Sequence, residues 1–194
     1  MTAKSCTTAI FAQKTYTMRK NIIVYGLIAG AVVSIPMLFM VNYMSYCNGN
    51  VDFNTSMLMG YASMLIAFSM VFVGVRNYRD KYNGGVISFG KAFKTGMLIV
   101  LLASTMYVAA WLINYFFFIP DFMEKYSAHE LANMKAGGAS QAELDKKTIE
   151  MADFARMYKN PFFNALITYA EILPVGLIVT LISSFILKRK AQTA

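Results

Sequence analysis

The chain has few charged residues, and they are nearly absent from four long stretches. Of its 194 residues, 14% are charged and 57% are hydrophobic, whereas a soluble domain carries about 25% charged residues. Low-charge runs of more than about 18 residues are typical of membrane-spanning helices. The composition therefore argues against an ordinary soluble domain and indicates an all-α integral membrane protein with four transmembrane helices.

Metal-binding and redox residues are equally scarce, with one His and two Cys, Cys6 and Cys47. Two distant cysteines make neither a zinc site nor a redox motif, and inert thiols are the simplest interpretation. The pattern His129-Glu130-Leu131-Ala132-Asn133 has Asn where zinc proteases need their second His. We expect no metal and no cofactor.

Catalytic motifs are missing as well. Gly90-Lys91-Ala92 lacks the Ser or Thr that completes a phosphate-binding loop, and the sequence contains no G-x-S-x-G nucleophile motif. We therefore expect that the protein is not an enzyme.

The chain does have a short basic linker between two apolar runs, from Gly74 to Gly96. Its five cations face a single acid, Asp80. The cations are Arg76, Arg79, Lys81, Lys91 and Lys94. Because short loops rich in Lys and Arg stay in the cytoplasm, we interpret the linker as a cytoplasmic anchor. Anionic lipid headgroups are its expected counterpart; nucleic acid is not, because the cations flank the spans instead of forming one face with interleaved aromatics.

The apolar runs predict the domain organisation. We expect spans at about residues 22–46, 57–75, 97–119 and 162–187, which together form a membrane domain over residues 22–187. Basic tails of residues 1–21 and 188–194 flank this domain. With both tails in the cytoplasm, that side holds 12 of the 18 cations. The sequence thus predicts a multi-pass protein of the bacterial cytoplasmic membrane with both termini inside.

Two further features are predicted outside the spans. From Val86 to Lys94, apolar residues alternate with cations, which favours a short interfacial helix. The loop from Cys47 to Ser56 has no Lys or Arg, which is typical of a short extracytoplasmic turn.

A polar segment of residues 120–161 separates the last two spans and carries six cations and seven anions. Gly137-Gly138 divides it, and Ser140-Gln141-Ala142-Glu143 is a capping-box pattern that predicts a second helix to about Tyr158. We expect an extracytoplasmic helical hairpin. The second helix carries an apolar stripe of Leu144, Met151, Phe154 and Tyr158.

The linker sequence V-F-V-G-V-R-N-Y-R-D-K-Y-N-G-G-V-I-S-F-G-K-A-F-K-T-G resembles the core signature of the domain-of-unknown-function family DUF4199. Three later stretches are similar to the same family: P-D-F-M-E-K-Y from Pro120, M-Y-K-N-P-F-F-N-A-L from Met157, and E-I-L-P-V-G-L-I-V from Glu171. The resemblance covers about Arg19 to Lys190. It implies a four-span fold in a bacterial cell membrane, and it implies no activity.

Glu171 is the one acid or base inside a predicted span. A lone carboxylate in hydrocarbon is costly, so such residues usually face the bundle or a cavity. No span offers a Lys or Arg, and we therefore expect hydrogen bonds from Asn42, Asn114 or Tyr107. Pro174 removes a backbone hydrogen bond close by. Two interpretations stay open: a proton or cation site, and a polar clasp that holds the bundle together.

Gly26 and Gly30 lie four residues apart in the first span. Small residues at this spacing let another helix approach closely. That helix could belong to a second copy of the chain or to this chain itself.

The function expected from these residues is a non-enzymatic interaction or structural component of the membrane. Its partner would be a second copy of the chain or a periplasmic or membrane protein, bound through the apolar stripe of the hairpin. The alternative is a small transporter or channel subunit that uses Glu171 as its proton or cation site.

Overall fold

The structure, a computed structural model, describes residues 3–46 and 53–190, with side chains described for residues 17–43 and 58–190. Residues 47–52 of the predicted turn, with Cys47, lie outside the described residues, and residues 53–56 belong to the first turn of α2. The elements are α1 (Ala3–Tyr46), α2 (Phe53–Asn77), the π-helical turn η1 (Tyr78–Tyr82), α3 (Phe89–Phe117), α4 (Phe122–Ala136), α5 (Gln141–Tyr158) and α6 (Pro161–Leu187). The described residues contain no strand beyond one isolated bridge between Ile87 and Arg189, so the fold is all-α.

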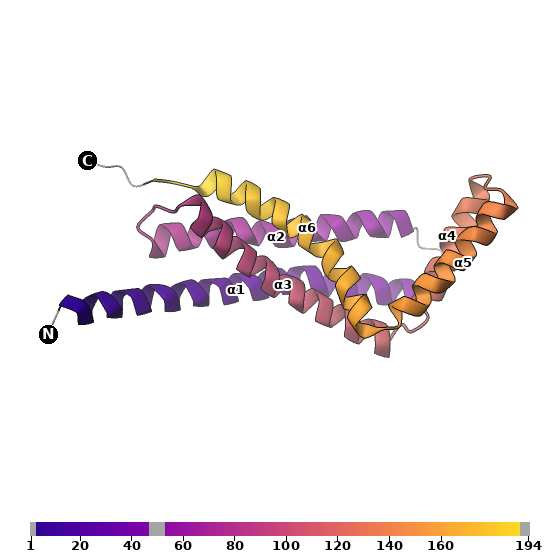
Figure 1. Cartoon of the computed structure of the whole chain (residues 1–194), viewed down its shortest axis with the longest axis horizontal. Coiled ribbons are helices and arrows are strands. Elements are labelled where there is room, and N and C mark those ends of the chain that lie inside the picture. The colour runs from indigo at the N-terminus through magenta and orange to yellow at the C-terminus, as the bar shows by residue number, and fades with distance from the viewer. Residues whose placement is uncertain (1–2, 47–52, 191–194) are drawn as a thin grey trace.

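Four of these helices are long and apolar enough to cross a membrane. The apolar segments are Thr17–Tyr43, Leu58–Tyr82, Phe89–Phe117 and Pro161–Leu187. They run side by side as a bundle in which α3 contacts α1, α2 and α6, while α2 also contacts α1 and α6 (Figure 1). The four-helix membrane fold expected from the sequence is confirmed, and α3 is its central helix.

Glycines let α3 approach its neighbours closely. A Cβ added to Gly26 would lie 2.7 Å from Leu102 Cδ2, and one added to Gly30 would lie 2.6 Å from Met106 Sδ. Both distances are shorter than a van der Waals contact, so neither position has room for a side chain. The glycine pair of α1 therefore packs against α3 of the same chain.

The basic linker differs from its prediction. Val86 to Lys94 does not form a separate interfacial helix, because α3 begins at Phe89 and continues without a break into the span. Ser88 caps this helix through its Oγ, which accepts from Lys91 N at 3.4 Å. Gly96, which could have ended a helix there, instead lies against Thr180 of α6. The helix that contains the predicted span thus begins about two turns before residue 97.

Most of the predicted basic tail of residues 1–21 is helical. Helix α1 begins at Ala3, so the residues before the span continue its helix.

Helices α4 and α5 project from the end of the bundle opposite the two chain ends (Figure 1). They contact each other and are joined by a turn in which Gly138 has φ +84°, a value that favours glycine. The capping box predicted at Ser140 is present: its Oγ accepts from Glu143 N, and Glu143 bonds back to Ser140 N at 2.8 Å. We call this end of the molecule the hairpin end.

The apolar stripe of α5 is covered largely by the chain itself. Met151 and Tyr158 are buried. The Phe154 ring lies 6.0 Å from that of Phe163 at the start of α6, and the Tyr158 ring lies 5.3 Å from that of Tyr115 in α3. The stripe therefore fixes α5 to the bundle.

Candidate functional site

Glu171 lies in the part of α6 nearer the hairpin end, and its side chain is exposed on the outside of the bundle. No described residue forms a hydrogen bond or an ion pair with its carboxylate. The expectation that Asn42, Asn114 or Tyr107 would hydrogen-bond Glu171 is therefore wrong. Helix rotation is the reason: the buried side of α6 at this level carries Ile172 and Thr168 instead.

Pro174 lies one turn along α6 from Glu171 and is also exposed. Tyr107 is buried in α3. Glu171 and Pro174 thus share the exposed side of α6, whereas Tyr107 lies inside the bundle.

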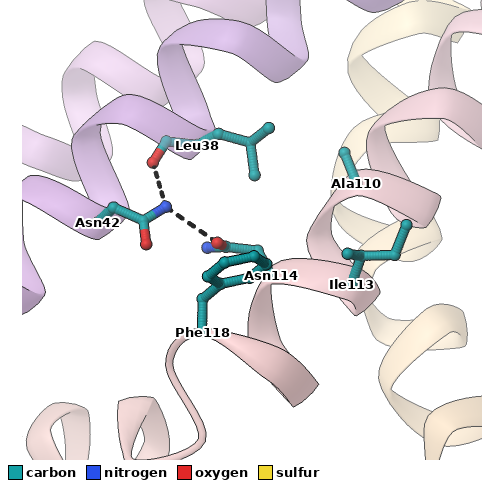
Figure 2. Close-up of a pocket in the computed structure, with 6 residues that line it drawn as sticks. All are labelled: Leu38, Asn42, Ala110, Ile113, Asn114 and Phe118. Atoms are coloured by element: carbon teal, nitrogen blue, oxygen red, sulfur yellow. Dashed lines mark hydrogen bonds between the residues drawn. The ribbon is translucent and has the colours of Figure 1, made fainter.

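Asn42 and Asn114 form a separate part, between α1 and α3. Asn42 Nδ2 donates to Asn114 Oδ1 at 2.9 Å and to the Leu38 carbonyl at 2.7 Å (Figure 2). The pair lies at a pocket of about 520 Å³ whose remaining lining is Leu38, Ala110, Ile113 and Phe118. The structure therefore does not bring the five residues predicted as one polar site together, and only Asn42 and Asn114 bond to each other.

A buried polar cluster at the hairpin end joins α3, α5 and α6. Trp111 Nε1 donates to Asn164 Oδ1 at 2.9 Å and to the Tyr158 hydroxyl at 3.1 Å. Asn164 Nδ2 donates to the Tyr158 carbonyl at 3.4 Å, and Thr168 Oγ1 donates to the Asn164 carbonyl at 2.8 Å. We call these four residues the hairpin-end clasp. Their hydrogen bonds and burial indicate a structural role.

The opposite end, which we call the basic end, has its own amide contacts. Asn21 Nδ2 donates to the Gly74 carbonyl at 2.9 Å, and Asn77 Nδ2 donates to Asn21 Oδ1 at 2.7 Å, which joins α1 to α2. Ile87 and Arg189 exchange two backbone hydrogen bonds, of 3.0 and 2.9 Å, so the residues after α6 pair with the linker. The start of the first span, the linker and the end of α6 therefore meet at one end of the bundle.

The five linker cations have different environments at this end. Arg79 is partly buried, donates to the Leu187 carbonyl at 3.3 Å and pairs with Asp80 at 2.6 Å. Lys91 Nζ donates to Asn83 Oδ1 at 3.1 Å and lies 5.2 Å from the centre of the Tyr78 ring. Arg76, Lys81 and Lys94 are exposed, and Arg76 Nε lies 3.6 Å from Asp80 Oδ2. The five cations of the predicted anchor thus range from partly buried and paired to exposed.

The exposed charges of α4 and α5 form local pairs. The Lys125 ammonium, 2.8 Å from Asp121, lowers the pKa of that carboxyl. Hydrogen bonds from the backbone and side chain of Ser140 lower the pKa of Glu143. Among the described residues, no group of three or more His, Cys, Asp or Glu could hold a metal ion. These helices carry charges that stabilise their own ends.

Sequence reasoning missed Asn164, Thr168, Asn21 and Asn77. Asn164 and Thr168 are four residues apart in an apolar span, which places them on one helix face and was a readable signal. Asn21 and Asn77 flank their spans, where a single sequence gives no sign of which helices meet.

Residues 24–189 match the model of a family described as "Protein of unknown function (DUF4199)". No curated protein and no solved structure matches the chain. The family match covers most of the sequence, including the linker, the hairpin, the last three candidate spans and the first span from residue 24 onward. The chain belongs to the DUF4199 family.

Proposed function

We propose that this protein is a non-enzymatic interaction or structural component of the bacterial cytoplasmic membrane, and that a membrane-embedded partner covers the α6 face that carries Glu171. The observation that supports this proposal is an exposed carboxylate within a span, with no partner among the described residues. An acidic side chain in hydrocarbon costs roughly 2.5–3.5 kcal/mol on insertion scales. A neighbouring helix with a hydrogen-bond donor or a cation would offset that cost.

The surroundings of Glu171 suit a helix as the partner. Pro174, Ile178 and Ile182 follow it at spacings of three and four residues, and the two isoleucines are 57% and 55% exposed. Residues at these spacings form one stripe along a helix. A second helix could lie along this stripe and reach the carboxylate.

The α6 face that carries Glu171 replaces, as the proposed binding surface, the two surfaces that the sequence favoured. The stripe of α5 contacts α3 and α6, and Gly26 and Gly30 contact α3. Surfaces that the chain already covers give little support to an external partner, so the α6 face becomes the better supported one.

The experiment replaces Glu171 by Leu in the tagged full-length chain, which is then purified in mild detergent from its own membranes. Loss of one polar contact between spans should weaken the complex roughly three- to fifteen-fold. Leu166→Ala, at an exposed α6 position on another side of the helix, is the matched control and should leave the complex unchanged. A complex that withstands Glu171→Leu, or the absence of any complex with the wild-type chain, overturns the proposal.

The proposed orientation places both termini and the linker in the cytoplasm, supported by the meeting of these segments at one basic end. In a variant without Cys6 and Cys47, Ser140→Cys should react with a membrane-impermeant thiol reagent in intact cells, and Asn83→Cys should not. The reverse pattern would show that the orientation is inverted.

The alternative is a small transporter or channel subunit, and the carboxylate of Glu171 within the candidate span Pro161–Leu187 is the observation in its favour. In that case proteoliposomes should show a pH-dependent ion flux that Glu171→Gln abolishes. Such a flux would replace the interaction role as the main proposal.

A further inference from the structure

The pocket between α1 and α3 contains a hydrogen-bond donor that the fold does not use. Asn42 Nδ2 is fixed toward the Leu38 carbonyl, because an amide oxygen in its place would face another oxygen. The same nitrogen donates to Asn114, so the atom of Asn114 that faces Asn42 is the acceptor Oδ1. Asn114 Nδ2 therefore faces elsewhere, with its two hydrogens available.

This donor is both buried and unpaired. Asn114 is 3% exposed, and no residue in the described part of the chain hydrogen-bonds its Nδ2. Such a group is costly unless something supplies an acceptor. Because Asn114 lines the pocket, a bound molecule with an acceptor oxygen could supply it.

The pocket is polar at one end and apolar at the other. Asn42 and Asn114 lie near the last turns of α1 and α3, while Leu38 and Ala110 lie one turn deeper in the bundle (Figure 2). Asn42 and Asn114 lie within the last turn of the candidate spans Thr17–Tyr43 and Phe89–Phe117, where the hydrocarbon core meets the headgroups. A glycerolipid in a bilayer is arranged in the same way: its ester carbonyls lie at the edge of the hydrocarbon core, and its acyl chains lie deeper.

We propose that this pocket binds one glycerolipid, whose ester carbonyl accepts from Asn114 Nδ2 and whose acyl chain lies along Leu38, Ala110 and Ile113. The pocket volume, about 520 Å³, lies within the range of sites that hold small ligands. The ligand recognised here is the glycerol ester, so the headgroup plays no part in selection. This proposal does not depend on whether a partner helix binds the α6 face that carries Glu171.

The test compares two phosphatidylethanolamines that differ only at the linkage, a diester and the corresponding diether. The full-length protein is delipidated in detergent and titrated with each lipid, and native mass spectrometry measures the first bound lipid. The diester should bind about five-fold more tightly, because the ether offers no carbonyl oxygen. Equal affinities for the wild-type chain overturn the proposal, and this comparison requires no variant.

Two variants then locate the site. Asn114→Leu should remove the preference for the diester, and Ala110→Phe, which fills the deep end, should weaken the binding of both lipids. Ser69→Ala is the matched control, since Ser69 is exposed on α2 and bonds only within its own helix; it should preserve the preference. A preference that persists in folded Asn114→Leu would place the ester elsewhere and overturn the proposal.

Discussion

At the basic end, Asn21 and Asn77 join two neighbouring helices through amide groups and the backbone of Gly74, and residues beyond the helices pair through Ile87 and Arg189. At the hairpin end, Trp111 and Asn164 join three helices through buried side chains. The hairpin-end clasp combines hydrogen bonds with large aromatic surfaces, whereas the basic end combines short polar contacts with exposed cations. We infer that the hairpin end contributes more to stability and the basic end more to placement in the membrane.

The largest effect should come from Trp111→Ala. This change removes a buried aromatic side chain and both of its hydrogen bonds, and large-to-small changes of this kind cost about 3–5 kcal/mol. Unfolding in a mixed-detergent titration should report the loss, and protease should cut between α4 and α5 more rapidly. An unchanged midpoint would show that the clasp is not a principal source of stability.

A smaller effect, and a direct comparison of the two ends, should come from replacing one buried asparagine at each end, Asn164 and Asn21. Asn164→Leu removes the acceptor of Trp111 Nε1 and should cost about 1–3 kcal/mol, because the indole donor keeps only Tyr158. Asn21→Leu should cost less, because the Gly74 carbonyl that it frees lies within a helix and the Asn77 amide that loses its acceptor is only half-buried. The two variants are measured in the same titration. A larger cost for Asn21→Leu would reverse the comparison.

The smallest effect should appear at the tip of the hairpin end as the pH falls. The pKa of Glu143 is lowered in the folded state. The ionised carboxylate therefore stabilises the folded helix above its ordinary pKa of about 4.3, and this stabilisation is lost as the pH falls through the lower folded pKa. Amide exchange at the first turn of α5 should then accelerate relative to the middle of the helix. Glu143→Gln should remove this pH dependence, and a dependence that remains would point to another group.

Much of the fold could be predicted because the sequence encodes it locally. The four spans follow from length and hydropathy, and the start of α5 follows from Ser140 and Glu143. The linker was predicted less well: the cations Lys91 and Lys94 resembled one face of a surface helix, although Ser88 provides the cap from which α3 runs directly into the membrane.

The site was harder to predict because it depends on how each helix is rotated about its axis. Glu171, Asn42 and Asn114 were correctly identified as polar residues within spans, yet one faces outward and the other two bond to each other. A single sequence gives the period of a helix but not its neighbour, so the partners of Glu171 could not be derived from it.

The position of α3 between α1 and α6 has a consequence for biogenesis. Helix α3 contacts both of them, and the residues after α6 are the ones that pair with the linker. During synthesis, the first three spans are therefore in the bilayer before the helix that completes their packing has left the ribosome. Until then, one side of α3 is open to lipid or to an insertion factor, and the bundle closes only when the final residues arrive.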